Sequence, residues 1–445
     1  MRAVAPALLA TLTLATAQPA AAAASLIVHE WGTFTSFQDS RGRTIPGINV
    51  DDEPVPQFVH RLREAQIFTT RSTPASWSQG APRCHPEVTL RLETPVLYFY
   101  PQSGFALNQL IDVRASFTNG WLTEFFPAAD ASNPGFPQDL RQSVRGSIEW
   151  KGLRLSRESS AGLPDTTEHV WLAPRNVKSA VVINAAEAEK YLFYRGVGHL
   201  DAPIVVREEG DSLSIALRNE EKLLTALPRM WIVHVSADKQ LTYRSIEPGN
   251  QRTLSARLPT AHAAQSALDA LRLELRAALQ TEGLYADEAD AMLATWRLSY
   301  FDSEGMRVFF VLPRSWTEAQ LPLSISAPAE VTRVMLGRVE LISAHQEAAL
   351  KRLYELPATA FDVPPLYYQD KSVLELMRGG ARSHAELYRA VGRPVPDALG
   401  LYESLGRFRD ALLAHEMRSA SDAERKARLM LIMERFSACV SGGTG

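Results

Sequence analysis

The stretch VTLRLETPVLYFYPQSGFALNQLIDVRASFTNGWLTEFFP, residues 88–127, carries the signals that determine the fold of this chain. Residues 90–95 alternate in polarity, which is the pattern of a β-strand with one face toward solvent. The run VLYFY at 96–100 is apolar on both faces and predicts a strand buried on both sides. Asn119-Gly120 separates two further strand-like runs, and this dipeptide typically marks a β-hairpin. The stretch therefore predicts the nucleus of an antiparallel β-sandwich.

Along the rest of the 445-residue chain, the predicted secondary structure changes twice between strands and helices. Strand-like segments with intervening turn residues continue to residue 250, the pattern of a sandwich rather than of βαβ units. A helical hairpin then follows, with one helix over 261–281 and a second that starts at an N-cap near Asp287. Strand-like runs return, and helices dominate from 344, the last of them starting after an N-cap at Asp422.

The predicted fold class is therefore α+β: a body rich in antiparallel β-sandwich, an inserted helical hairpin and a helical C-terminal region. The expected organisation divides the chain into a β-rich domain over 25–250, the hairpin with returning strands over 251–343, and the helical region over 344–445.

The first 24 residues have the composition of a secretory signal peptide. Met1-Arg2 gives a positive start, residues 3–17 are apolar, and small residues fill 20–24. This order predicts export through a cleaved signal, hence a periplasmic or extracellular protein. The later chain contains no stretch apolar enough to cross a bilayer, so the exported form is expected to be soluble, without a transmembrane segment.

The charge balance argues against two classes of partner. The chain has 47 basic and 50 acidic residues, a formal net charge of −3, and no long run of either sign. A nucleic-acid groove or a surface for anionic membranes would require a basic concentration that this sequence lacks. The expected partner is an unknown ligand or an envelope component.

Two cysteines, Cys84 and Cys439, lie near opposite ends of the chain. In an oxidising compartment they could pair and close a very long loop, which would stabilise the fold by on the order of 4–5 kcal/mol. Two unpaired thiols fit the sequence equally well, because the spacing of cysteines does not fix their pairing.

Four residues are candidates for catalysis. His29 and Glu30 are a histidine and a carboxylate that could share a metal or a proton, although neighbours on a strand point to opposite faces. Glu93 and Glu124 could act as paired carboxylates in glycoside hydrolysis. The alternative is structural for all four: a satisfied histidine, and carboxylates that are solvated or paired with arginine.

His199 and Asp201 are candidate metal ligands. Residues i and i+2 of an extended segment lie on one face, so an imidazole and a carboxylate could hold one metal or form a hydrogen-bonded pair. Further ligands would have to come from distant positions such as His85 or His169. A simple turn hydrogen bond is the alternative.

The segment HEWGTFTS at 29–36 resembles a stretch found just after the signal peptide in an uncharacterised group of exported bacterial proteins. LETPVLYFYP at 92–101, GWLTEFFP at 120–127, LFYRGVG at 192–198 and VMLGRVEL at 334–341 are similar to further landmarks of that group. The resemblance implies export. It implies no chemistry, cofactor or catalytic residue.

Two classes of function remain. The first is a non-catalytic exported protein that binds a ligand, a partner or an envelope component. The second is a hydrolase that acts on a glycan or a peptide, with or without the help of a metal ion. The sequence contains neither a G-x-S-x-G elbow nor a phosphate-binding glycine loop, and it identifies no cofactor.

Overall fold

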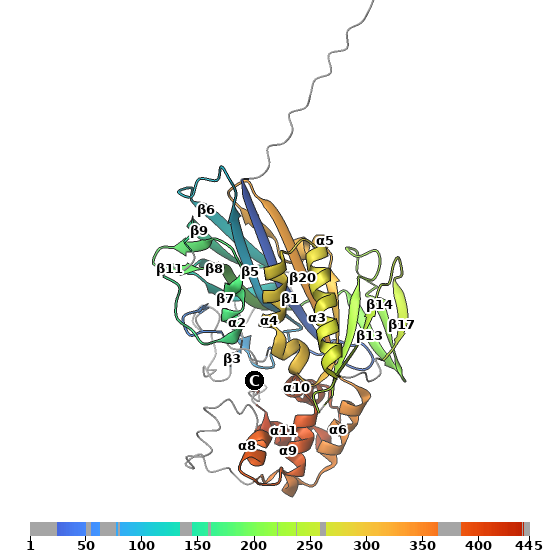
Figure 1. The fold of residues 1–445 in the computed structure, drawn as a ribbon. Coiled ribbons are helices and arrows are strands. Elements are labelled where there is room, and N and C mark those ends of the chain that lie inside the picture. The colour runs from blue at the N-terminus through green and yellow to red at the C-terminus, as the bar shows by residue number, and fades with distance from the viewer. Residues whose placement is uncertain are drawn as a thin grey trace, which may run out of the picture.

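One large β-sheet forms the body of the protein (Figure 1). The computed structural model describes residues 25–49, 55–62, 77–78, 81–133, 145–158, 162–219, 221–236, 238–258, 264–363, 384–437 and 439. Within these residues, fifteen strands join into one mixed sheet, whose main path has the order β11-β10-β9-β7-β12-β5-β1-β20-β18-β15-β16.

The strands on the main path are β11 (Glu187–Glu189), β10 (Val181–Asn184), β9 (Arg145–Ser156), β7 (Gly120–Phe126), β12 (Leu192–Gly198), β5 (Leu90–Pro101), β1 (Leu26–Gln38), β20 (Glu330–Leu341), β18 (Gly305–Leu312), β15 (Met230–Val235) and β16 (Leu241–Ile246). The strands that join beside it are β2 (His60–Arg61), β6 (Ile111–Thr118), β8 (Asp130–Ser132) and β19 (Leu323–Ile325). The two smaller sheets contain β13 (Ile204–Glu209), β14 (Ser212–Leu217) and β17 (Thr253–Arg257), and β3 (Trp77–Ser78) with β4 (Ala81–Pro82).

The helices form two groups. Those between the strands are α2 (His169–Leu172), the 3₁₀ turn η2 (Pro174–Asn176), α3 (Ala264–Thr281), α4 (Ala286–Thr295), the π-helical turn η3 (Leu298–Asp302) and α5 (Arg314–Gln320). Those of the C-terminal region are α6 (Ala344–Glu355), the 3₁₀ turn η4 (Ala358–Phe361), α8 (His384–Ala390), α9 (Asp397–Ser404), α10 (Arg409–Ser419) and α11 (Ala423–Phe436). Among the described helices, none is both long and apolar enough to span a bilayer.

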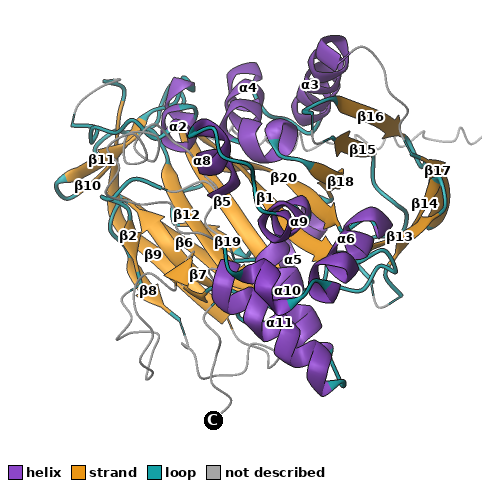
Figure 2. Cartoon of the chain, turned by 90° about the horizontal axis from the view of Figure 1, so that it is seen from below, coloured by secondary structure: helices purple, strands orange, loops and turns teal. Residues whose placement is uncertain are grey.

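Both faces of the central sheet are buried, as the run at 96–100 predicts. Val96 and Tyr98 of β5 pack into a core beneath α3 and α4, whereas Leu97 and Phe99 pack into a second core on the opposite face. Figure 2 shows the C-terminal helices gathered to one side of the sheet. Full burial of each large apolar side chain contributes about 1.5–3 kcal/mol, so this two-sided packing is the main source of stability.

The sheet is mixed rather than antiparallel. β1 pairs antiparallel with β5 but parallel with β20, from Ile27 opposite Glu330 to Gln38 opposite Leu341. The prediction of an α+β fold with a helical C-terminal region is confirmed. The antiparallel β-sandwich is not confirmed, because the strands join into one sheet with a parallel pair at its centre.

The hairpin predicted at Asn119-Gly120 is wrong. β6 pairs with β9 and β19, whereas β7, directly after it, pairs with β12. Asn119 has a φ of 58°, which turns the chain sharply from β6 into β7 instead of returning it along the same ladder. A Cβ atom on Gly120 would lie 2.4 Å from Cδ1 of Phe117, so only glycine lets the Phe117 ring fold over this corner.

The helical hairpin is formed by α3 and α4, but its predicted N-cap at Asp287 is wrong. Tyr285 occupies that position, and its backbone N–H donates to Glu288 Oε2 at 2.7 Å. The N-cap predicted at Asp422 is confirmed, because its side chain accepts a hydrogen bond from the backbone N–H of Arg425 at 2.6 Å. Both caps satisfy N–H groups that a helix leaves without internal partners.

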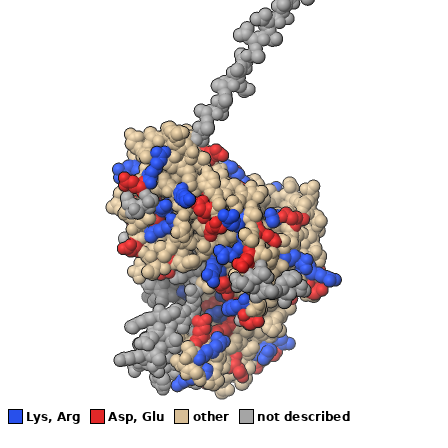
Figure 3. Space-filling view, in the orientation of Figure 1, with Lys and Arg blue, Asp and Glu red and all other residues tan. Residues whose placement is uncertain are grey.

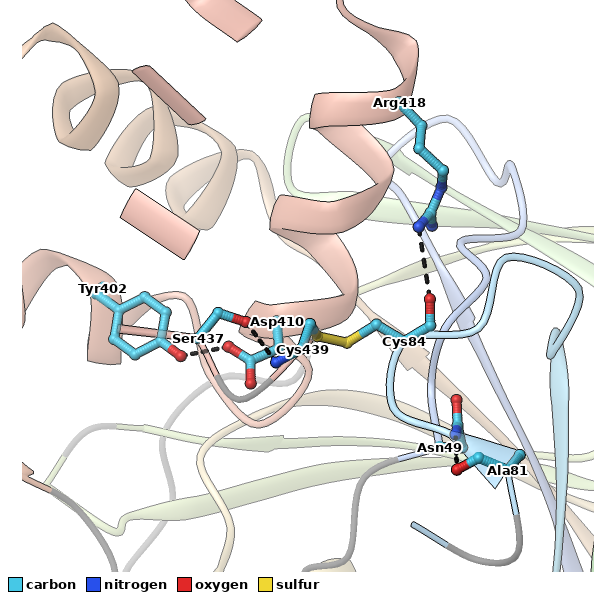
Figure 4. Close-up of a disulfide and its surroundings, with 8 residues drawn as sticks. All are labelled: Asn49, Ala81, Cys84, Tyr402, Asp410, Arg418, Ser437 and Cys439. Atoms are coloured by element: carbon cyan, nitrogen blue, oxygen red, sulfur yellow. Dashed lines mark hydrogen bonds between the residues drawn. A yellow bond between two sulfur atoms is a disulfide. The ribbon is translucent and has the colours of Figure 1, made fainter. Parts of the chain in front are cut away.

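Cys84 and Cys439 form a disulfide, with their Cα atoms 5.7 Å apart (Figure 4). The bond links the loop before β5 to the segment after α11. Beside it, Arg418 of α10 donates to the carbonyl oxygen of Cys84 at 3.5 Å. The C-terminal region is therefore attached to the body by a covalent bond, which resolves the alternative that the sequence leaves open.

Candidate functional site

A cleft of about 1060 Å³ with a mixed lining lies between the body, the β13–β14 sheet, α5 and α10. Its ionisable and hydrogen-bonding lining residues come from segments that are far apart in the sequence. They are Thr44, Thr89, Asn119, His199, Asp201, Arg218, Glu221, Lys222, Gln320 and His415. Its volume and mixed lining are those of a site for a small or medium-sized ligand.

The two candidate metal ligands, His199 and Asp201, both line this cleft. Each already has a protein partner: His199 Nδ1 lies 2.9 Å from the carbonyl oxygen of Glu87, and the Thr44 hydroxyl donates to Asp201 Oδ1 at 2.5 Å. Across the described residues, no three His, Cys, Asp or Glu side chains gather closely enough to hold a metal ion. A metal role for the pair stays a prediction.

The charges in the cleft are of both signs. Arg218 Nη1 lies 3.4 Å from Asp201 Oδ2, and the adjacent Glu221 and Lys222 add one charge of each sign. Burial lowers the pKa of His415, and so do the nearby guanidinium groups of Arg418 and Arg43. The cleft thus offers cationic, anionic and neutral hydrogen-bonding groups together, an arrangement suited to a polar ligand that carries both charges.

The loop at one edge of the cleft contains a histidine with a perturbed pKa. Burial, together with the nearby charge of Arg418, lowers the pKa of His85 to about 4. The backbone N–H of Glu87 donates to His85 Nδ1 at 3.3 Å, which fits a neutral imidazole. Protonating His85 would bury a second positive charge beside Arg418, so acid should weaken this edge of the fold.

This arrangement predicts a pH dependence of stability. The pKa of His85 is lower in the folded protein than its ordinary 6.5, so its contribution is complete above pH 6.5 and is lost as the pH falls toward 4. We expect a His85→Asn variant to lack this loss, which is at most about 3 kcal/mol. Urea unfolding between pH 7 and 4 measures it. The exposed His345→Asn variant should retain the parent's pH profile, and an equal profile for His85→Asn would contradict the prediction.

His29 and Glu30 point to opposite faces of β1, as neighbours on a strand do. His29 Nδ1 lies 2.7 Å from Glu288 Oε2, beneath α4, and Glu288 also accepts a hydrogen bond from Tyr100 at 2.7 Å. On the other face, Glu30 accepts hydrogen bonds from Tyr194 and from Arg333. The two residues therefore do not share a site.

Glu93 and Glu124 lie on strands that are separated by β12, so their side chains belong to different ion pairs. Glu93 lies 3.0 Å from Arg91 and 2.9 Å from Arg338, and Glu124 contacts Arg61 and Arg195. The structure does not bring the four catalytic candidates together.

Sequence reasoning missed most of the cleft. Arg218, Glu221 and Lys222 lie in a polar loop after β14, and His415 lies on α10; none belongs to a motif. The only signal was the His199 and Asp201 pair. Residues from Thr44 to His415 converge here through tertiary packing, which no local pattern reports.

Comparison with known proteins gives little further information. No family model matches the sequence, and no curated protein does. Among solved structures, the Fcho1 Mu homology domain of Danio rerio with bound Eps15 peptide is similar over 72% of this chain and 95% of that chain, at 7% identity and a TM-score of 0.26. A score this low supports no statement about fold or function.

Proposed function

We propose that this chain is an exported, non-catalytic binding protein that holds a polar ligand carrying both charges in the cleft lined by His199, Asp201 and Lys222. The observation that carries the proposal is the cleft itself. Side chains of both charge signs line it next to neutral amides and hydroxyls. Such a lining can pair with the amino and the carboxylate groups of one ligand.

Export is part of the same proposal. Residues 1–24 have the order of a secretory signal, and the Cys84–Cys439 disulfide is of a kind that persists in oxidising compartments. The landmark segments that resemble exported bacterial proteins point the same way. The periplasm or the cell exterior is therefore the proposed location.

We also propose a sandwich-like arrangement for the front half. Phe117 of β6 and Trp150 of β9 lie against Phe34 of β1 and Tyr194 of β12, with ring centroids 6.1 and 6.2 Å apart. These contacts support two β layers packed face to face, although the strands belong to one sheet.

The hydrolase alternative receives less support. A general acid or nucleophile needs access to its substrate, whereas Glu30, Glu93 and Glu124 are buried and held by arginines. Figure 3 shows basic and acidic side chains interspersed over one face of the molecule, which agrees with recognition of mixed rather than single-sign charge.

A charge reversal in the cleft tests the proposed site. We expect soluble disaccharide-tetrapeptide fragments of peptidoglycan, which carry amino and carboxylate groups, to bind the full chain in isothermal titration calorimetry. The Lys222→Glu variant should bind them about fivefold more weakly, because an exposed attractive charge becomes repulsive. Lys222 is exposed, so the variant should fold normally.

Lys426→Glu is the matched control, since Lys426 is equally exposed on α11 and does not line the cleft. It should leave the affinity unchanged. Absence of binding to the parent chain would contradict the ligand class. Equal affinities of the parent and the Lys222→Glu variant would contradict the location of the site.

A further inference from the structure

The lining of the cleft is divided by charge. Its carboxylate, ammonium and guanidinium groups all come from the segments that flank β13 and β14: Asp201, Arg218, Glu221 and Lys222. A second set of polar and aromatic residues, called the neutral wall here, carries none of these groups: Thr89, Asn119, His199, Trp316 and Gln320. The neutral wall is formed by the loop before β5, the corner between β6 and β7, the segment after β12, and α5.

Backbone and side-chain contacts hold the neutral wall together. The backbone N–H of His199 donates to the carbonyl oxygen of Asn119 at 2.8 Å. The hydroxyl of Thr118, the residue before this corner, donates to the carbonyl oxygen of Ala319 on α5 at 3.1 Å. The imidazole of His199 and the amide of Asn119 are therefore attached to neighbouring points of the backbone.

His199 presents a hydrogen-bond acceptor to the cleft. Its Nδ1 lies 2.9 Å from the carbonyl oxygen of Glu87, and because a carbonyl oxygen can only accept, Nδ1 carries the proton. In the neutral imidazole the lone pair then lies on Nε2. Nε2 has no hydrogen bond to a described residue and is not among the fully buried polar atoms that lack a partner. It is therefore accessible to a ligand in the cleft.

Asn119 adds donors and a further acceptor beside this imidazole. Its side-chain amide has an oxygen that accepts and a nitrogen with two N–H donors. Neither atom is paired within the described part of the chain, and neither is among the fully buried atoms without a partner. Asn119 has a φ of 58°, a conformation that asparagine adopts more readily than most residues. The corner thus holds the amide at the surface of the cleft.

These groups favour a ligand with hydroxyl groups. A carboxylate cannot donate to His199 Nε2, and an ammonium group finds no carboxylate on the neutral wall. Asp201, two residues further along the chain, already pairs with Thr44 and Arg218. Two neighbouring hydroxyl groups, in contrast, can donate to Nε2 and accept from the Asn119 amide. The exposed Pro86 and the half-buried Leu200 add apolar surface to the cleft for C–H groups. Neighbouring hydroxyls on a ring of C–H groups are the surface of a sugar.

We propose that the neutral wall binds a sugar ring, with one hydroxyl donating to His199 Nε2 and its neighbour accepting from the Asn119 amide. The inference rests on the proposed function and extends it. The ligand becomes a glycoconjugate, whose sugar lies against the neutral wall and whose charged part lies near Lys222. This assigns His199 and Asn119 a role in ligand specificity that requires no metal ion.

Two probes separate the sugar from the charged part of such a ligand. N,N′-diacetylchitobiose is a neutral disaccharide, whereas the free tetrapeptide of peptidoglycan carries amino and carboxylate groups but no sugar. We measure the dissociation constant of each for the full chain by saturation-transfer difference NMR, and both should bind in the millimolar range. Asn119→Gly should weaken chitobiose binding about fivefold, the effect of losing one hydrogen bond, and leave tetrapeptide binding unchanged. Lys222→Glu should have the reverse effect.

Glycine accepts the positive φ at position 119, so the Asn119→Gly variant should fold. The matched control is Ala185→Gly, since Ala185 has a φ of 50°, is exposed and does not line the cleft. It should leave both affinities unchanged. A second variant, His199→Phe, keeps a ring but removes the acceptor, and should also weaken chitobiose binding about fivefold. Circular dichroism shows that each variant is folded.

The two probes distinguish failure of this inference from failure of the proposed function. If the parent does not bind chitobiose, or if Asn119→Gly weakens both probes equally, the sugar site is refuted, while tetrapeptide binding still supports the proposed function. If the parent binds chitobiose but not the tetrapeptide, and Asn119→Gly weakens that binding, the sugar site is supported and the proposed charged ligand is refuted.

Discussion

Replacing Glu93 by Gln will lower the free energy of unfolding by about 3–5 kcal/mol, the usual effect of removing one partner from a buried ion pair. Glu93 is 1% exposed and is held by two buried arginines, Arg91 at 3.0 Å and Arg338 at 2.9 Å. The amide would remove the charge of Glu93 from beside both guanidinium groups in the interior of the sheet, and Arg338 would keep the longer contact with Glu340 at 3.5 Å. Urea unfolding followed by tryptophan fluorescence measures the change.

The control for this variant is Glu355→Gln. Glu355 lies 3.9 Å from Lys351 on the exposed face of α6, so its loss should change stability by less than about 1 kcal/mol. A second variant, Glu93→Gln with Arg338→Met, also removes one of the two buried guanidinium charges and should recover part of the loss. If Glu93→Gln were as stable as the parent, Glu93 would not be an ion-pair residue, and its catalytic interpretation would regain support.

Removing the disulfide will have the second large effect. The double variant Cys84→Ser, Cys439→Ser should lose on the order of 4–5 kcal/mol, because the bond closes a loop with a sequence separation of 355 and so restricts the unfolded chain. The loss should appear first in the C-terminal region. Without the bond, only side-chain packing and contacts such as that from Arg418 to the Cys84 carbonyl hold this region to the body.

Thermal unfolding compares the double variant with the oxidised parent, and hydrogen exchange locates the change. Exchange in α10 and α11 should accelerate more than exchange in β1 and β5. Treating the parent with a reducing agent should reproduce the variant's behaviour, and the same agent should have no effect on the variant. Equal stability of the oxidised and reduced parent would contradict the prediction.

Local patterns of the sequence predict many of the secondary-structure elements and which of their faces are buried. The doubly apolar run at 96–100 is a strand buried on both faces, and the helical stripe at 261–281 corresponds to α3, which covers one of those faces. The cap at Asp422 is also a local signal. In each case neighbours in the sequence decide the outcome, through side-chain periodicity or through one hydrogen bond.

The pairing of strands and the sites could not be predicted in this way. Asn119-Gly120 has the signature of a hairpin, yet β7 finds its partners in β12, β2 and β9, and tertiary packing prevails over the turn signal. Glu93 and Glu124 look like paired carboxylates in one short stretch, but β12, made of residues near 195, lies between their strands. Which arginine meets which glutamate depends on contacts between segments that are far apart in the chain.

The parallel pairing of β1 with β20 has a consequence for the order in which the protein assembles. β1 ends at Gln38 and β20 begins at Glu330, so a chain made from its N-terminus produces the first strand long before its neighbour exists. Until about three-quarters of the polypeptide has been synthesised, one edge of that strand remains open and able to recruit a foreign strand. The pairing of β1 with β20 is thus completed late in synthesis. Until then, the growing chain depends on other contacts or on a binding partner that covers the open edge of β1.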